Sequence, residues 1–223
     1  MVNKDFSEQK CYRLIPSKFP PIDLYEDVAS VDELEAVYAI EKLTNPRIEQ
    51  QAGNLDLVPK EDWLTGPGSS FAMAAFTHLN PDGGRFTTGD FGAYYCAEHL
   101  NTAIKETVYH QERILSYTNE PSQTIQMRCI KATFSACLVD LTEHESLESS
   151  LYHPTCYKES KAFALSCKQN NEDGIAYFSV RHTNNLCFAL YKPKLITSIC
   201  QAEHFGYMWN GRTINNVIKL TMI

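Results

Sequence analysis

The sequence contains no run of basic residues and no long apolar stretch. Its 20 lysines and arginines are outnumbered by 27 acidic residues, which gives a formal charge of −7 at pH 7. This balance argues against a nonspecific nucleic-acid surface and against an anchor to anionic membranes. No segment has the length of a membrane span, and the N-terminus lacks the apolar stretch of a signal peptide. We therefore expect a cytoplasmic protein that neither enters a membrane nor binds nucleic acid directly.

Common metal and redox motifs are missing as well. The eight cysteines form no CxxC pair and the seven histidines form no HExxH motif, so we expect reduced thiols in the core and no metal ion. His153 and Cys156 come nearest to a metal-ligand spacing, but they are a single pair. The glycine fingerprint G-x-G-x-x-G is also absent, which argues against a dehydrogenase that uses NAD as a redox cofactor.

The apolar content is sufficient for one folded unit. With 223 residues, of which 43% are hydrophobic, we expect the whole chain, residues 1–223, to form a single domain. Ser30 and Glu33 have the spacing of a capping box, which predicts a helix that ends before Pro46. This helix and the loop after it form a predicted helical appendage over 14–62, and residues 63–223 form the predicted core.

Strand patterns outnumber helical patterns within that core. Asn210-Gly211 predicts a hairpin with a type I′ turn, because both turn positions require positive φ. Since strands do not alternate regularly with helices, we expect an α+β fold. Strands are predicted at 71–79, twice within 124–142, at 174–182 and at 185–191, and helices at about 98–115 and within 156–170.

Several polar residues lie on faces that a core would not need. If residues 174–182 form a strand, Ser179 and Arg181 share the face opposite Phe178. Glu106 lies outside the apolar stripe of its predicted helix. Arg85 follows two glycines, which permit unusual backbone angles and the close approach of a ligand. Each position taken alone also fits a solvent-exposed face or an ordinary turn.

Taken together and in order, these segments resemble the signature of RES-domain proteins, a family named after an arginine, a glutamate and a serine. GGRFTTGDFGAYYCAEHLNTAIKETVYH contains the GGR turn, a strand with Tyr95, and a T-A-x-x-E pattern that ends at Glu106. EDGIAYFSVRH resembles the D-G-I-x-Y-x-S-V-R segment of the family and supplies Ser179 and Arg181. The early CYRLI, with Arg13, fits the opening arginine of the family.

The sequence departs from the family pattern at three positions. Phe86 and Thr87 stand where tryptophan and a small polar residue are usual, and Phe178 stands where proline is common. These differences concern the detail of substrate binding more than the class of reaction.

The resemblance implies a fold similar to that of ADP-ribosyltransferases, with a bent, split mixed sheet that holds NAD in its cleft. It implies a toxin of a bacterial toxin–antitoxin pair that depletes NAD and is neutralised by a helix-turn-helix antitoxin of the Xre class. NAD would then be a substrate, and no cofactor would be needed.

The resemblance also implies roles for individual residues. A planar guanidinium can grip a diphosphate, so Arg85 on its glycine turn is the expected anchor. The ring of Tyr95 would stack on nicotinamide. Glu106 would stabilise the positive charge that develops on the ribose, and Ser179 would bind that ribose or orient Glu106. Arg181 is either a second anion contact or a salt-bridged strand residue. The expected catalytic residues are Glu106, Arg85 and Ser179, and the expected substrate-binding residues are Arg13, Gly84, Arg85, Tyr95, Ser179 and Arg181.

Other functions remain open at this point. The same residues would serve a transferase that moves ADP-ribose to a protein or nucleic-acid target, and NAD cleavage itself could proceed by hydrolysis or by phosphorolysis. A non-catalytic binding module could keep the same fold. A cysteine hydrolase that uses Cys156 with a histidine is a more distant alternative. The helical appendage could also mediate a homodimer.

Overall fold

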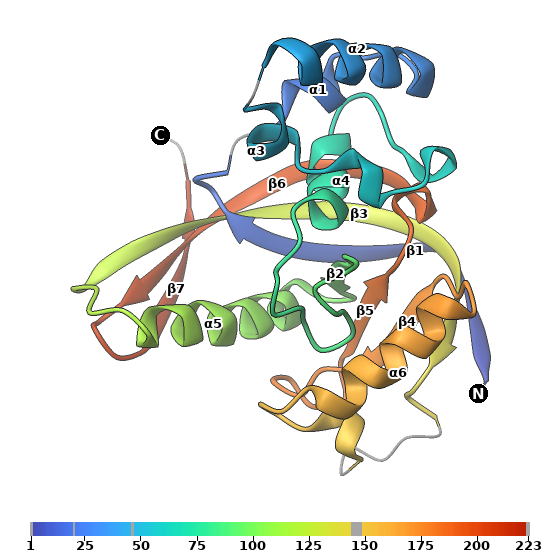
Figure 1. Ribbon diagram of the computed structural model, residues 1–223. Helices are drawn as coiled ribbons and strands as arrows, with labels where there is room; N and C mark the ends of the chain where they lie inside the picture. Colours follow the sequence, from blue (N-terminus) through green and yellow to red (C-terminus); the bar gives the residue numbers. More distant parts are fainter. Residues whose placement is uncertain (1, 20, 46, 144–148, 222–223) are drawn as a thin grey trace.

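A mixed β-sheet forms the centre of the computed structural model, which describes residues 2–19, 21–45, 47–143 and 149–221. Within these residues the sheet has seven strands in the order β1-β2-β5-β4-β3-β6-β7 (Figure 1). The strands are β1 (Asn3–Pro16), β2 (Tyr94–Ala97), β3 (Gln123–Asp140), β4 (Gly174–Phe178), β5 (Leu186–Leu190), β6 (Ile196–Trp209) and β7 (Ile214–Leu220).

The first strand closes part of this sheet on itself. β1 pairs antiparallel with β3 along most of its length and contacts β2 on its other edge through Tyr12 and Ala97. The strands β1, β2, β5, β4 and β3 therefore form a closed ring, while β6 and β7 extend from the other edge of β3. β3 and β4 pair in parallel at Val139 and Asp140, so the sheet is mixed. The predicted α+β class is confirmed.

Side chains alternate between the two faces of this sheet. On β3, Met127, Cys129 and Val139 enter one hydrophobic cluster, whereas Phe134 and Leu138 enter another. The alternation continues without a break, which is why this segment forms one long strand. The prediction of two strands here is therefore wrong.

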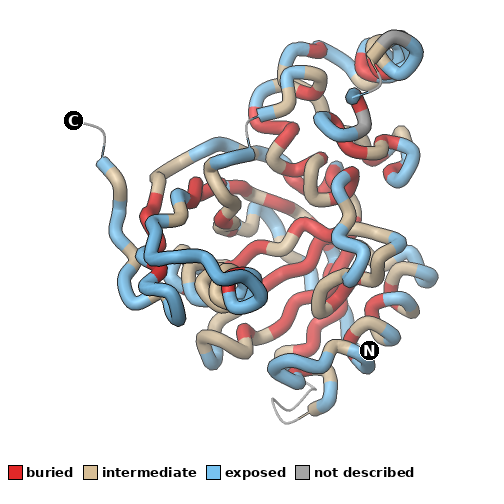
Figure 2. Tube along the Cα trace, turned by 60° about the vertical axis from the view of Figure 1, so that its left-hand side comes forward, coloured by how far each residue is buried: buried red, intermediate tan, exposed pale blue. Residues whose placement is uncertain are grey.

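Helices cover both faces (Figure 1). α4 (Ser69–Thr77) packs on the face that contains Phe134, and α5 (Leu100–Ser116) and α6 (Lys158–Gln169) pack on the opposite face. Buried residues are concentrated along the central strands, and exposed residues surround them (Figure 2). Within the described residues, no helix is both long and apolar enough to span a bilayer. The predicted helices at 98–115 and within 156–170 are confirmed.

The predicted strand at 71–79 is wrong, because these residues belong to α4. Its buried residues include Ser69, Met73, Phe76 and Thr77, which recur at the spacing of one helical face. Three alanines with high helix propensity reinforce this preference. A short apolar run does not by itself distinguish a strand from a buried helix.

Two other local predictions need correction. The hairpin between β6 and β7 is present, but the turn is not type I′, because Gly211 has φ of 96° while Asn210 lies outside the positive-φ region. Instead, Asn210 Oδ1 accepts from the backbone N of Arg212 and Thr213, each at 2.9 Å. The strand β4 also ends at Phe178, so Ser179 and Arg181 lie in the following loop rather than on one strand face.

The N-terminal helices pack beside α4 (Figure 1). Ser30 caps α2 as predicted, because its Oγ accepts from Glu33 N at 3.2 Å. The return bond of the capping box is shifted by one residue, since Glu33 Oε2 accepts from Ala29 N at 2.7 Å rather than from Ser30 N. Pro46, the predicted stop, lies outside the described residues. Met73 of α4 enters the core of this appendage. The appendage contains α1 (Asp23–Glu26), α2 (Val31–Thr44) and α3 (Ile48–Ala52). The 3₁₀ turns among the described residues are η1 (Leu55–Leu57), η2 (Lys60–Asp62), η3 (Ser150–Tyr152) and η4 (Pro193–Leu195).

Candidate functional site

Glu106 and Ser179 form the centre of the candidate site. Ser179 Oγ donates a hydrogen bond of 2.5 Å to Glu106 Oε1. Ser179 Oγ also accepts hydrogen bonds from the backbone N of Arg181 at 3.1 Å and of His182 at 2.8 Å. Because two backbone donors occupy this oxygen, its own proton is directed at the carboxylate. Ser179 is 1% exposed, so it fixes Glu106 from a buried position.

A second contact ties α5 to the loop after β4. Thr102 lies one turn before Glu106 in α5 and is fully buried. A hydrogen bond of 2.9 Å joins its Oγ1 to His182 Nδ1. The backbone N of Ser179 also donates to Asn185 O at 2.8 Å, which closes the loop. Glu106 and Ser179 are therefore held in register by their neighbours. Sequence reasoning did not find His182, which carries no motif of its own.

Arg85 reaches this region from its glycine turn. Gly83 has φ of 64°, and Gly84 forms an isolated bridge with Thr87. The Nη1 of Arg85 donates to the carbonyl oxygens of Leu151 and His153, each at 2.9 Å. Its guanidinium lies 4.6 Å from the centre of the Tyr157 ring. Among the described residues, Arg85 forms no ion pair, so its charge is not neutralised by a carboxylate.

Tyr95 holds this turn in place. Its hydroxyl accepts from Phe86 N at 2.9 Å and contacts Thr87 Oγ1 at 3.2 Å. A Cβ on Gly84 would lie 2.8 Å from that hydroxyl, so only glycine allows this approach. Burial raises the pKa of Tyr95 to about 12, which keeps the hydroxyl neutral. The predicted stacking of Tyr95 on nicotinamide stays a prediction beside this observed role.

Arg13 and Arg181 occupy different surroundings. Arg13, in β1, donates from Nη1 to Tyr95 O at 2.9 Å and lies 5.0 Å from the centre of the Tyr94 ring. It therefore supports the strand that carries Tyr95. Arg181 donates to Pro154 O, and its guanidinium lies 3.4 Å from the centre of the Tyr109 ring. Within the described residues it forms no ion pair, and it lies in the loop after β4 rather than in a strand.

The charges of Glu106 and Arg85 both affect the pKa values of two buried groups, Cys187 and Tyr177. Burial raises the pKa of Cys187 well above its ordinary value, and the charge of Glu106 raises it further while Arg85 opposes the rise. Burial raises the pKa of Tyr177 too; Cys187 and Glu106 add to it, and Arg85 again opposes. Glu106 and Arg85 therefore act on the same small region. Both Tyr177 and Cys187 remain neutral there.

Comparisons with known proteins decide the family. The family model described as RES domain matches residues 61–210. The chain belongs to the RES-domain family. The matched segment contains Arg85, Tyr95, Glu106, Ser179 and Arg181, whereas Arg13 and the N-terminal helices lie outside it.

This RES-domain chain is similar to two further proteins. It is 30% identical over 213 residues to the uncharacterized protein y4oC of Sinorhizobium fredii (strain NBRC 101917 / NGR234), a match that covers 92% of this chain and 84% of the relative. It also matches a chain in the crystal structure of the M. tuberculosis MbcT–MbcA toxin–antitoxin complex, with 12% identity and a TM-score of 0.46. That match covers 94% of this chain and 87% of the other.

His153 and Cys156, whose spacing came nearest to that of metal ligands, lie together in a turn of the RES domain. His153 Nδ1 accepts from the backbone N of Cys156 at 2.8 Å and of Thr155 at 3.2 Å. Across the described residues, no group of three or more histidine, cysteine or acidic side chains could hold a metal ion. Five of the eight cysteines are buried; the exposed ones are Cys137, Cys156 and Cys200.

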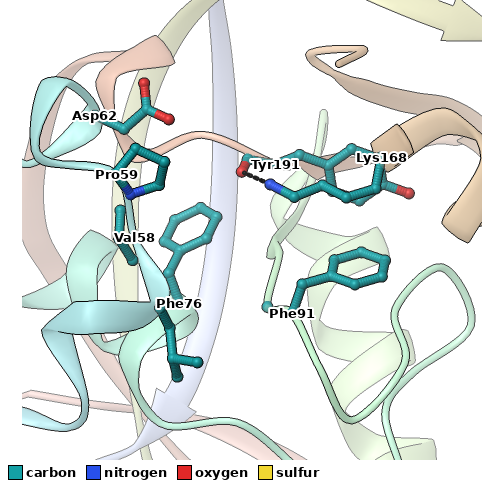
Figure 3. A pocket seen from close by; sticks show the side chains of 9 residues that line it. Val58, Pro59, Asp62, Phe76, Phe91, Lys168 and Tyr191 are labelled. Atoms are coloured by element: carbon teal, nitrogen blue, oxygen red, sulfur yellow. Dashed lines mark hydrogen bonds between the residues drawn. The ribbon is translucent and has the colours of Figure 1, made fainter. Parts of the chain in front are cut away.

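A separate small cavity lies away from these residues (Figure 3). It has a volume of about 10 Å³ and is lined by Val58, Phe76, Phe91, Lys168 and Tyr191, among others. Lys168 Nζ donates to Tyr191 O at 3.4 Å beside it. This volume suits about one water molecule. None of the predicted site residues lines the cavity, so it is distinct from the candidate site.

Proposed function

We propose that this RES-domain protein is an enzyme that cleaves the bond between nicotinamide and ribose in NAD. The observation that carries the proposal is the hydrogen bond of 2.5 Å by which buried Ser179 holds Glu106. A carboxylate fixed in this way is suited to stabilise a cation that develops at a defined position.

The chemistry of NAD matches the charges at this site. Loss of nicotinamide builds positive charge on the anomeric carbon of the ribose, which a nearby carboxylate stabilises. The diphosphate of NAD is negatively charged, and guanidinium groups bind phosphate oxygens in a bidentate manner. Arg85 and Arg181 form no ion pair with a described carboxylate, so both can serve an anionic substrate.

Nicotinamide release is the direct test. The purified protein is incubated with NAD, and products are separated by chromatography, in water alone and with added phosphate. Replacing Glu106 by Gln keeps the size of the side chain but removes its charge, so turnover should fall roughly 100-fold or more. NAD affinity, measured by calorimetry, should change little. A Glu106→Gln variant with the parent rate would contradict the proposed mechanism.

Two alternatives give different results in the same assay. A transferase releases nicotinamide faster when its protein or nucleic-acid acceptor is present, and ADP-ribose becomes attached to that acceptor. A binding module binds NAD without releasing nicotinamide. The product formed with phosphate separates phosphorolysis from hydrolysis.

Family membership supports a wider role as the toxin of a toxin–antitoxin pair. Expression of the protein alone should arrest bacterial growth while cellular NAD falls. An antitoxin of the Xre class should block the cleft, with a carboxylate-bearing segment near Arg85. Growth arrest with unchanged NAD would separate the toxin role from the proposed substrate, and a complex that cleaves NAD at the full rate would rule out occlusion. The homodimer through the N-terminal helices stays a prediction.

A further inference from the structure

One short segment contacts Arg85 and Arg181, the two site arginines for which the described part of the chain provides no carboxylate partner. The carbonyl oxygens of Leu151 and His153 accept from Arg85, and the carbonyl oxygen of Pro154 accepts from Arg181. The ring of Tyr157 lies 4.6 Å from the Arg85 guanidinium. We call residues 151–157 the positioning segment. Its contacts with the arginines use backbone oxygens and one aromatic ring, without any carboxylate.

These contacts leave part of Arg85 available. A guanidinium has five N–H donors, and the two on Nη1 are used by the two carbonyls. Within the described residues, Nε and Nη2 have no protein acceptor. Their donors point from adjacent atoms, which is the arrangement that grips two oxygens of a phosphate. The segment thus fixes the plane of the guanidinium and leaves a fork free for substrate.

The side chain of His153 closes a turn within the exposed part of the segment. Residues 153–156 are all exposed, so burial contributes little to their conformation. His153 Nδ1 accepts the backbone N–H groups of Thr155 and Cys156 and thereby closes the turn. Further back, buried Tyr152 donates from its hydroxyl to Leu141 O at 3.3 Å, which fastens the start of the segment.

We propose that the positioning segment presets Arg85 and Arg181 for the diphosphate of the substrate, and that His153 is a positioning residue for this purpose. The inference rests on the proposed function. His153 touches neither the substrate nor the reacting atoms; it acts through the turn whose carbonyls orient the two guanidinium groups. A preset arginine loses less conformational freedom when the substrate binds, so the expected benefit is in affinity.

Three variants test this role through steady-state kinetics. His153→Ala removes the acceptor of the turn but keeps every backbone carbonyl, so KM for NAD should rise about 5- to 10-fold while kcat changes less than about 2-fold. His153→Asn should restore the parent KM, because an asparagine oxygen can accept N–H groups two and three residues onward, as Asn210 does here. Thr155→Ala is the matched control in the same exposed turn and should resemble the parent.

A second measurement does not depend on turnover. NMR relaxation of the arginine Nε–H groups reports their order, and Arg85→Ala and Arg181→Ala identify the two signals. Both groups should be ordered in the parent, Thr155→Ala and His153→Asn proteins, and mobile in His153→Ala. If the arginines show this pattern of order but the parent protein releases no nicotinamide, the proposed function is contradicted and the positioning role is retained.

Three results would overturn the inference. The first is an unchanged KM in His153→Ala of an active enzyme. The second is a loss of kcat at constant KM. The third is an asparagine variant that behaves like the alanine variant, since the turn would then not explain the effect.

Discussion

Removing the hydroxyl of Ser179 tests the geometry at the centre of the site. In Ser179→Ala, Glu106 loses the donor that holds its Oε1 at 2.5 Å. The backbone N–H groups of Arg181 and His182 lose their acceptor as well. The carboxylate keeps its charge but is free to turn away from the ribose, so the variant separates the position of Glu106 from its presence.

The size of the effect follows from the bond that is lost. A hydrogen bond to a charged group contributes about 1.5–3 kcal/mol. If this contribution is expressed fully in the transition state, kcat falls roughly 10- to 100-fold, since each 1.36 kcal/mol is a factor of ten. The loss should be smaller than in Glu106→Gln, where the charge itself is removed. NAD affinity should fall less than in Arg85→Ala, because Arg85 keeps all its contacts and only the backbone N–H of Arg181 loses an acceptor.

The assay is nicotinamide release over a range of NAD concentrations, with thermal unfolding to check that the variant folds. Ser116→Ala is the matched control. Ser116 lies at the end of α5, the helix that carries Glu106, and its hydroxyl donates to Arg113 O at 2.7 Å. This control should retain the parent kcat. A folded Ser179→Ala protein with unchanged kcat would refute the view that Ser179 positions a catalytic carboxylate.

Three further predictions concern the glycine turn. Gly84→Ala should lower the free energy of unfolding by about 1–3 kcal/mol in urea denaturation, because its Cβ would lie 2.8 Å from the Tyr95 hydroxyl; adding Tyr95→Phe should recover part of that loss. Burial raises the pKa of Tyr95 from 10.0 to about 12. Its contribution to the free energy of unfolding is therefore fully present below pH 10 and is lost as the pH rises through 12. Over that pH window the free energy of unfolding of the parent should fall relative to that of Tyr95→Phe. Arg85→Ala should weaken NAD binding in calorimetry as well as turnover, unlike Glu106→Gln, and unchanged affinity would exclude Arg85 as an anchor.

The sequence singled out Glu106 and Ser179 as candidates but could not predict the hydrogen bond that joins them. The motifs identified Glu106 and Ser179, while leaving open whether the serine binds ribose or orients the glutamate. The structure provides the contact for the second role. Tyr109 and Tyr157, which lie beside Arg181 and Arg85, carry no motif that would reveal them.

The segment at 151–157 could not be predicted for a physical reason. It contacts the arginines mainly through carbonyl oxygens, which every residue type has, so its residue types carry no signal of the interaction. The capping box at Ser30 and the helix around Glu106 were predictable because local hydrogen bonds and periodicity specify them. The nature of α4 was not, because tertiary packing decides how a short apolar run folds.

The pairing of β1 with β3 affects when the protein can fold during its synthesis on the ribosome. Residues 3–16 find their partners at 127–139, so the first strand must wait for more than half of the chain before it can pair. Such sequence-distant pairing slows folding, because a long loop must close before contacts stabilise it. The hydrogen bond to Glu106 forms later still, because Ser179 is synthesised after all of these strand residues. An incomplete chain that ends before this serine would lack the hydrogen bond that fixes Glu106, so the candidate site is complete only after Ser179 has been synthesised.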